Sequence, residues 1–240
     1  QVRFAPQVGK FKVYIIDEVH MLSAQAFNAF LKTLEEPPAH AIFILATTEK
    51  HKIIPTILSR CQIFDFKRIT VDDIAQHLAF VAKSEGVEAD PEGLHIIAQK
   101  ADGALRDALS IFDRLVSFHD NALTYENVIT NLDILDYDYF FKATDLILQQ
   151  DIQKALLLFN EIMEKGFEAD QFANGLASHF RDLLVSQDTQ TIELLEVGPN
   201  IKARYVQQAK DCDVAFLIYG LRILNDCDIN YKASSNQRLL

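Results

Sequence analysis

The chain has 240 residues, and its 23 basic and 34 acidic residues give a formal net charge of -11. Its apolar fraction of 49% and charged fraction of 24% are those of an ordinary globular protein, not of a disordered or fibrous one. The acidic excess argues against a surface that binds nucleic acid as a whole, and no apolar run approaches the roughly 20 residues that cross a bilayer.

The first 67 residues alternate apolar strands with one helix. The runs Val13–Ile16 and Ala41–Ala46 are wholly apolar, which is typical of strands covered on both faces of a sheet. The segment between them has apolar residues at helical spacing, with Ser23 as a cap and a proline pair as its end. Because a strand, a helix and a strand follow one another closely, we expect a βαβ unit with parallel strands.

A third short strand is predicted at Ile63–Phe66, and almost every later segment is typical of a helix. Caps and glycine ends delimit the helices of a small domain over residues 68–134. Amphipathic helices over residues 135–240 form another all-helical domain. The sequence therefore predicts an α/β domain over residues 1–67, followed by two all-α domains.

Two acids, Asp17 and Glu18, follow the first apolar strand directly. The carboxyl end of a parallel strand is where such sheets place their ligands. One carboxylate there can hold Mg²⁺, and its neighbour can orient a water that attacks a γ-phosphate. Because two acids can equally begin a solvated loop, this segment alone leaves both interpretations open.

The chain lacks the GxxxxGK[ST] loop that cradles a triphosphate. Its one Gly-Lys pair, Gly9-Lys10, has Phe4 in place of the earlier glycine and Phe11 in place of the hydroxyl residue. We therefore expect either a fragment or a degenerate member of a nucleotide-binding family.

Five motifs occur in order along the chain: KVYIIDEVHMLS (12–23), NAFLKTLEEPP (28–38), ILATTE (44–49), ILSRC (57–61) and GALRDAL (103–109). Together they resemble the gamma/tau subunits of bacterial DNA polymerase III, which are the motor subunits of the sliding-clamp loader and members of the AAA+ ATPases. The resemblance is specific over residues 12–131 and weaker beyond them. What the chain lacks is the family's N-terminal ATPase region, with the phosphate loop and a four-cysteine zinc module.

This resemblance implies a partial P-loop AAA+ domain, a helical lid domain and a helical collar domain. The AAA+ strand order is 5-1-4-3-2, and the chain would hold strands 3, 4 and 5 only. Strands 4 and 5 would then have unpaired edges. We expect strands 3 and 4 to pair in parallel, and residues 53–67 to be displaced, poorly ordered or paired with another chain.

The resemblance also implies a role for each candidate site residue. Asp17 would hold Mg²⁺ with ATP, and Glu18 would be the catalytic base. Thr48 corresponds to sensor 1, which contacts the γ-phosphate or the attacking water. Arg60 of the SRC motif would act in trans, on the ATP of the neighbouring subunit. Arg106 corresponds to sensor 2 and would contact the ATP of its own subunit.

Each role has a structural alternative. Arg60 alone is typical of a surface arginine, and Arg106 beside an aspartate is typical of a surface charge pair. Thr48 can cap the turn after its strand, which is compatible with a sensor role. His20 and His51 are interpreted as loop or capping histidines and not as ligands.

For the full-length protein the resemblance implies an ATPase that couples ATP hydrolysis to loading of the sliding clamp on primed DNA. The implied cofactors are ATP and Mg²⁺. The implied partners are other clamp-loader subunits (gamma/tau, delta and delta-prime), the clamp and primer-template DNA. Without a phosphate loop, the fragment itself is expected to be inactive and to bind no cofactor.

Two alternatives stay open. The first is a delta-prime-like subunit, which keeps the SRC arginine but hydrolyses nothing; the intact Asp17-Glu18 pair and Arg106 argue against it, since they would serve no chemistry there. The second is an AAA+-derived interaction module without catalysis. A GxxxxGK[ST] sequence upstream of Gln1 would separate the ATPase from both.

The 3 cysteines, Cys61, Cys212 and Cys227, show no CxxC spacing. Neither a disulfide framework nor a zinc site is therefore indicated. We expect reduced thiols in a cytoplasmic protein.

Overall fold

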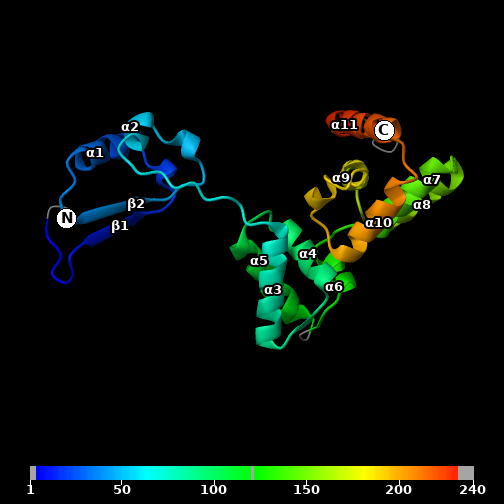
Figure 1. The fold of residues 1–240 in the computed structure, drawn as a ribbon, viewed down its shortest axis with the longest axis horizontal. Helices are drawn as coiled ribbons and strands as arrows, with labels where there is room; N and C mark the ends of the chain where they lie inside the picture. Colours follow the sequence, from blue (N-terminus) through cyan, green and yellow to red (C-terminus); the bar gives the residue numbers. More distant parts are fainter. Residues whose placement is uncertain (1–3, 120–121, 232–240) are drawn as a thin grey trace. The chain divides into compact units, whose positions relative to one another are not determined.

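The computed structural model describes residues 4–119 and 122–231, which are mostly helical and include two small parallel sheets (Figure 1). The chain divides into two compact units, Gln1–Lys67 and Arg68–Leu240. The first unit has one hydrophobic core and the second has two, and each unit is described by itself.

A strand–helix–strand motif forms the centre of the first unit. β1 (Lys12–Ile16) pairs in parallel with β2 (Ala41–Leu45), and α1 (Ala24–Glu35) connects them. The Oγ of Ser23 caps α1 by accepting a hydrogen bond from the Ala26 amide at 3.2 Å. The predicted βαβ unit and its cap are thus confirmed.

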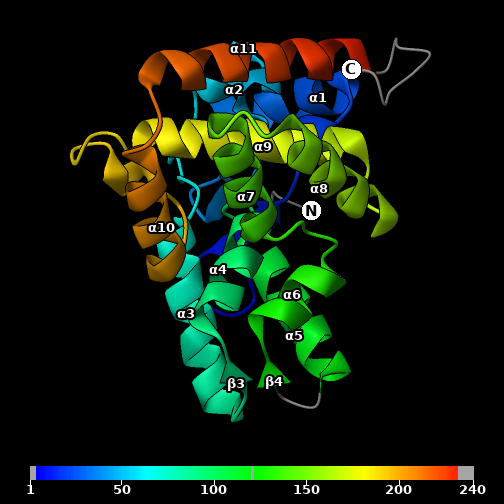
Figure 2. The same cartoon turned by 90° about the vertical axis from the view of Figure 1, so that its right-hand side faces the viewer.

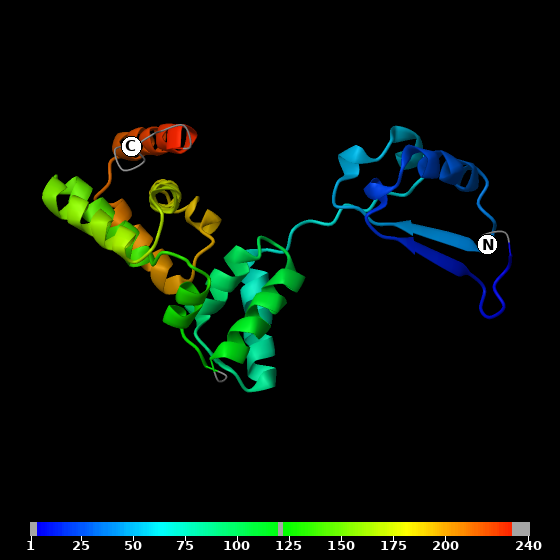
Figure 3. The ribbon, with the colours of Figure 1, turned by 180° about the vertical axis from the view of Figure 1, so that it is seen from behind.

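The two faces of this sheet differ. On one face the rings of Tyr14 and Phe43 stack at 5.2 Å, and Phe30 of α1 meets Phe43 edge-on at 5.1 Å. The helices of the unit lie on this side of the strands (Figure 3). The other face presents side chains that are 41–70% exposed: Val13, Ile15, Ile42 and Ile44. The prediction that both faces are covered is therefore wrong, because side chains alternate across a strand and, among the described residues of this unit, helices lie on one face only.

Short helical turns complete the first unit: η1 (Val19–Met21), η2 (Lys50–Lys52) and α2 (Pro55–Leu58). They bring Val19, Ile53 and Ile57 into a small core with Phe27 of α1. The start of the segment that was expected to be displaced is therefore packed.

The third strand predicted at Ile63–Phe66 does not form. These residues have no assigned helix or strand, and Phe66 is 95% exposed. A strand needs a neighbour for its amides and carbonyls, and the sheet described in this unit holds β1 and β2 only. An ion pair between Asp65 and Lys50 Nζ, 3.0 Å apart, instead links the segment to η2.

The second unit begins with a group of helices around one core: α3 (Val71–Glu85), α4 (Pro91–Lys100), α5 (Leu105–Phe118) and α6 (Tyr125–Asn131). Thr70 caps α3 through a bond from the Asp73 amide at 3.2 Å, and Gly86 ends it with a φ of 71°. A parallel pair that the sequence did not predict, β3 (Glu88–Ala89) and β4 (Ala122–Leu123), joins the helix ends.

The remaining helices pack around a second core: α7 (Tyr137–Leu148), α8 (Ile152–Glu164), α9 (Ala169–Val185), α10 (Pro199–Ala209) and α11 (Val214–Tyr231), with a short turn η3 (Ile192–Leu194) before α10. α9 and α11 run side by side in Figure 2. The helices predicted over residues 135–240 are confirmed in the part of the chain that the structure describes, whereas a boundary between separate lid and collar domains stays a prediction.

Polar contacts join the two cores of the second unit. The backbone amide of Asn200, at the start of α10, donates to Glu92 Oε1 of α4 at 3.1 Å. The hydroxyl of Tyr137 donates to Gln99 Oε1 at 3.1 Å. α4 is therefore connected to both α7 and α10.

Candidate functional site

The turn after β1 presents two carboxylates. Glu18 has a φ of 47° and a ψ of 45°, a left-handed conformation that costs a non-glycine residue about 1–3 kcal/mol. Its amide donates to Asp17 Oδ1 at 3.0 Å, and the next amide, of Val19, donates to the Ala46 carbonyl at 2.9 Å. This backbone holds Asp17 and Glu18 at the carboxyl end of the sheet, with both side chains exposed.

Thr48 lies beside this acid pair. Its hydroxyl donates to Glu18 Oε2 at 3.4 Å. The contact follows from the register, in which Ile16 is opposite Leu45, so the residues that follow the two strands meet at one edge of the sheet. The structure thus brings together the predicted base and the predicted sensor threonine.

His20 is a neighbour of this pair that the sequence reasoning interpreted only as a loop or capping residue. Its side chain is 8% exposed, and its Nδ1 lies 2.9 Å from Thr47 Oγ1 and 3.3 Å from Glu18 Oε2. Its Nε2 lies 3.0 Å from Glu49 Oε2. The sequence feature that could have indicated this contact is the position of His20 in the turn after β1, since Thr47 and Glu49 follow the paired strand β2.

Glu49 is the second carboxylate beside His20. Lys52 Nζ donates to Glu49 Oε2 at 2.7 Å. This hydrogen bond, together with the positive charge of Lys52, lowers the pKa of Glu49 below its ordinary value. Glu49 is therefore ionised at neutral pH.

Arg60 follows α2 and is already paired. Its guanidinium donates to Glu35 Oε1 at 3.0 Å and to the carbonyl of Thr56 at 2.8 Å. The arginine that was predicted to act on a neighbouring ATP is thus held by a carboxylate of its own unit.

Arg106 is exposed in the first turn of α5 and belongs to the second unit. The turn before it has two positive φ angles, 46° at Asp102, which strains a non-glycine residue, and 84° at Gly103, which a glycine adopts freely. A Cβ on Gly103 would lie 2.7 Å from the Cβ of Arg68. The glycine of the GALRDAL motif is therefore required both by its backbone and by its neighbour.

The donor groups at the end of β1 suit a hard cation. Asp17 and Glu18 offer carboxylate oxygens, and Mg²⁺ prefers oxygen ligands while keeping several waters or phosphate oxygens. Within residues 4–119 and 122–231, no cluster of three or more His, Cys, Asp or Glu side chains is arranged around a metal position.

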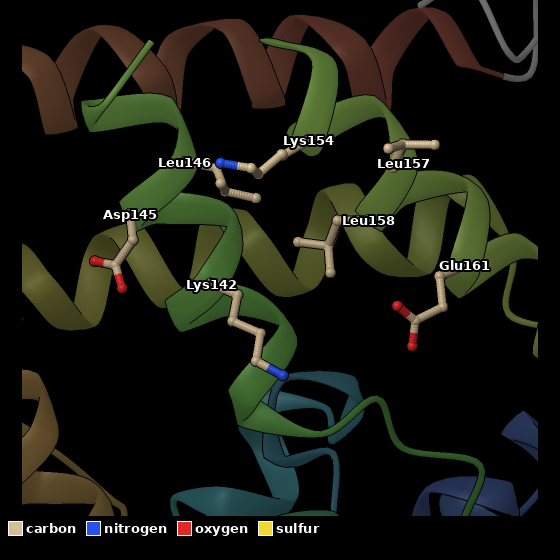
Figure 4. Close-up of a pocket in the computed structure, with 7 residues that line it drawn as sticks. All are labelled: Lys142, Asp145, Leu146, Lys154, Leu157, Leu158 and Glu161. Atoms are coloured by element: carbon tan, nitrogen blue, oxygen red, sulfur yellow. The ribbon is translucent and has the colours of Figure 1, made fainter. Parts of the chain in front are cut away.

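A shallow pocket of about 400 Å³ lies between α7 and α8 (Figure 4). Lys142 and Asp145 line it from α7, and Lys154, Leu158 and Glu161 line it from α8. None of the predicted site residues lies there, so the pocket is not the predicted nucleotide site.

Comparison with known proteins gives the class. Residues 1–70 match the family model of the DNA polymerase III delta subunit, and residues 73–121 match that of the ATPase lid domain of DNA polymerase III clamp loader subunits. The chain is therefore related to clamp-loader subunits. No helix in the described part of the chain has the length and apolar character needed to cross a membrane.

Individual relatives narrow the class further. The chain is 38% identical over 239 residues to DNA polymerase III subunit tau of Bacillus subtilis, covering 100% of this chain and 42% of that protein. It is 42% identical over 167 residues to subunit tau of Salmonella typhimurium, covering 70% of this chain and 26% of that protein. It is 34% identical over 236 residues to subunit gamma of Buchnera aphidicola, covering 97% and 61%. The chain belongs to the DNA polymerase III gamma/tau subunit family.

The chain spans less than half of the length of the two tau subunits it matches. Among solved structures, the Bacillus subtilis DNA clamp loader delta protein is similar, with a TM-score of 0.46 and 15% identity, covering 99% of this chain and 77% of that one.

Proposed function

We propose that the full-length protein is an ATPase subunit of the bacterial DNA polymerase III clamp loader, which couples ATP hydrolysis to loading of the sliding clamp on primed DNA. The observation that supports this best is the contact of Thr48 Oγ1 with Glu18 Oε2, 3.4 Å apart at the carboxyl end of the sheet. It joins an acid that can take a proton from water to a hydroxyl that can bind the same water. The similarity to tau and gamma subunits supports the same function.

In this proposal Glu18 is the catalytic base and Asp17 holds Mg²⁺. When bound, ATP and Mg²⁺ supply the γ-phosphate and the charge that polarises it. Glu18 orients the attacking water and accepts its proton, and Thr48 contacts that water or the phosphate. Because both residues follow paired strands closely, the sheet keeps them in place.

Arginines from two places complete the proposed site. Arg60 acts in trans on the ATP of the neighbouring subunit, where its planar guanidinium can stabilise charge that develops on phosphate. In the single chain its partner is Glu35. Arg106, in the first turn of α5, acts on the ATP of its own subunit.

We further propose that residues 68–134 form the lid and residues 135–240 the collar that joins subunits into a ring. α11 supports this role, because it exposes a group of apolar side chains that a ring contact would cover: Val214, Ile218, Tyr219 and Ile223. The proposed partners are gamma/tau, delta and delta-prime subunits, the sliding clamp and primer-template DNA, in the cytoplasm.

The substitution Glu18→Gln tests the proposed function in the full-length protein assembled with its partner subunits. We expect ATP turnover to fall about 10²–10⁴-fold, the usual contribution of a general base, while ATP still binds. Glu36→Gln is the matched control, since Glu36 is an exposed acid of the same unit. Turnover that survives Glu18→Gln at the control level contradicts the proposed role.

A delta-prime-like subunit without hydrolysis is the second candidate. The match of residues 1–70 to the delta-subunit model favours it. Equilibrium binding of ATP to the unmodified full-length protein separates the two candidates, since the delta-prime-like subunit would not bind it. An unmodified full-length protein that binds no ATP would therefore favour the second candidate.

A further inference from the structure

The imidazole of His20 lies between two carboxylates. Its Nδ1 is 3.3 Å from Glu18 Oε2, and its Nε2 is 3.0 Å from Glu49 Oε2. The side chain is only 8% exposed, whereas that of Glu18 is 50% exposed. His20 therefore connects an exposed acid at the candidate site to a fixed acid behind it.

Glu49, the carboxylate on the other side of His20, is held by several contacts. Glu49 is ionised and is held by Lys52 Nζ at 2.7 Å. Its backbone amide also donates to Thr47 Oγ1 at 3.0 Å, and Thr47 Oγ1 lies 2.9 Å from His20 Nδ1. The imidazole thus has partners at both nitrogens, which restrict the rotation of its ring.

On the side of the candidate site, the contacts of His20 and Thr48 are made with one oxygen of the Glu18 carboxylate. Thr48 Oγ1 and His20 Nδ1 both approach Oε2, at 3.4 Å and 3.3 Å. These two contacts leave the other oxygen, Oε1, for a further partner. The backbone of Glu18 is in the left-handed region, which strains the turn. The contacts with Thr48 and His20 hold the carboxylate that this turn presents.

We propose that His20 is a positioning residue that fixes Oε2 of Glu18, so that Oε1 is presented to the attacking water. This inference rests on the proposed function of Glu18 as the catalytic base. Carboxylate oxygens only accept hydrogen bonds, so each contact requires hydrogen on the ring nitrogen that makes it: Nδ1, which Thr47 Oγ1 and Glu18 Oε2 share, and Nε2, whose contact with Glu49 sets the orientation of the ring.

A purely structural histidine would fill the same nearly buried space, so the test must separate the two nitrogens. Asparagine places its amide nitrogen near the position of Nδ1, and glutamine places its own near that of Nε2. His20→Asn therefore keeps the Glu18 contact, His20→Gln keeps the Glu49 contact, and His20→Ala removes both.

The variants are compared in the full-length protein assembled with its partner subunits, by steady-state ATP turnover and by equilibrium binding of ATP. Because misplacement of a catalytic group lowers the rate more than binding, we expect His20→Ala to lower kcat about tenfold or more, with KM and ATP affinity within about twofold. His20→Asn should restore most of kcat, and His20→Gln should not. His51→Ala is the control, since His51 also faces Glu49 but is 76% exposed.

Adding His20→Ala to Glu18→Gln should cause no further loss, because His20 acts through Glu18. The inference is overturned if His20→Ala keeps its kcat, if glutamine restores kcat as well as asparagine does, or if all variants lose kcat in proportion to thermal stability. If Glu18→Gln abolishes turnover while His20→Ala does not, only the inference fails. If the unmodified protein has no turnover, the proposed function fails with it.

Discussion

Single residues in this chain owe their environment to partners far along the sequence. His20 meets Thr47 and Glu49, which a sequence pattern cannot bring together without the strand register. The acid pair and Thr48, in contrast, could be predicted, because each follows an apolar strand directly. Local sequence therefore indicated which groups lie at the edge of the sheet, but not the histidine that joins them.

A buried histidine gives a prediction at the same scale. His179 of α9 is 1% exposed, with its Nδ1 3.0 Å from the Tyr205 hydroxyl and its Nε2 2.9 Å from Gln208 Oε1. Burial lowers the pKa of His179 to about 4 from its ordinary 6.5. The unfolded chain therefore binds this proton more readily, so the contribution of His179 to stability is present above pH 6.5 and is lost as the pH falls toward 4.

We expect His179→Gln to flatten the dependence of the free energy of unfolding on pH between about 4 and 6.5, by on the order of 3 kcal/mol at most. Urea denaturation at several pH values measures this. His77→Gln is the control, because His77 is exposed on α3. The comparison must be between variants, since burial also raises the pKa of Asp182 to about 6, which acts in the opposite direction. An unchanged slope for His179→Gln would contradict the prediction.

At the scale of elements, helices were predictable and short strands were not. Helical spacing, caps and glycine ends are local, and they predicted that the chain beyond residue 67 is mainly helical, which α3 to α11 confirm. A strand depends on a neighbour, so an apolar run such as Ile63–Phe66 does not become one where the described sheet offers no partner. The pair β3 and β4 was missed because strands of two residues are too short to show the alternation of apolar and polar residues that predicts a strand.

The start of α10 gives a prediction about how elements are joined. Glu92 of α4 accepts a hydrogen bond from the Asn200 amide, and a Cβ on Gly198 would lie 1.9 Å from Glu92 Oε2. Gly198→Ala should therefore displace the carboxylate and lower the free energy of unfolding by about 1 kcal/mol, the usual value of a lost helix cap. Chemical denaturation measures the loss, and hydrogen exchange at the Asn200 amide locates it.

A double-mutant cycle provides the control for this contact. In a Glu92→Ala background the clash and the cap are both absent, so Gly198→Ala should have little further effect. Equal losses in the two backgrounds would show that Gly198 acts on stability by some other route.

For the whole molecule, exposed apolar surface is the main feature that composition could not locate. A mean apolar fraction of 49% is ordinary, yet α11 and the open face of the β1–β2 sheet concentrate exposed aliphatic side chains. Apolar periodicity predicted the helices and strands that bear them. Which face stays open depends on what packs beside it, and that is set by tertiary structure.

The exposed face of α11 gives a prediction about assembly. Ile223 is 49% exposed on this helix. If α11 contributes to the proposed ring, Ile223→Lys should raise the dissociation constant between full-length subunits about tenfold, because a buried charge replaces apolar contact. Sedimentation velocity over a range of concentrations measures this constant. Asn225→Lys adds the same charge at an exposed polar position of α11 and serves as control; equal effects of both substitutions would count against a specific contact at Ile223.

The pairing of Arg60 with Glu35 has a consequence for the order of events in the proposed ring. A guanidinium that is already paired with a carboxylate exchanges one anionic partner for another when it binds a phosphate. Glu35, whose side chain is already 52% exposed, would then be left to solvent or to a cation on the adjacent subunit. Subunit docking and arginine delivery would thus be one exchange reaction, and the side chain left behind would influence how readily it reverses.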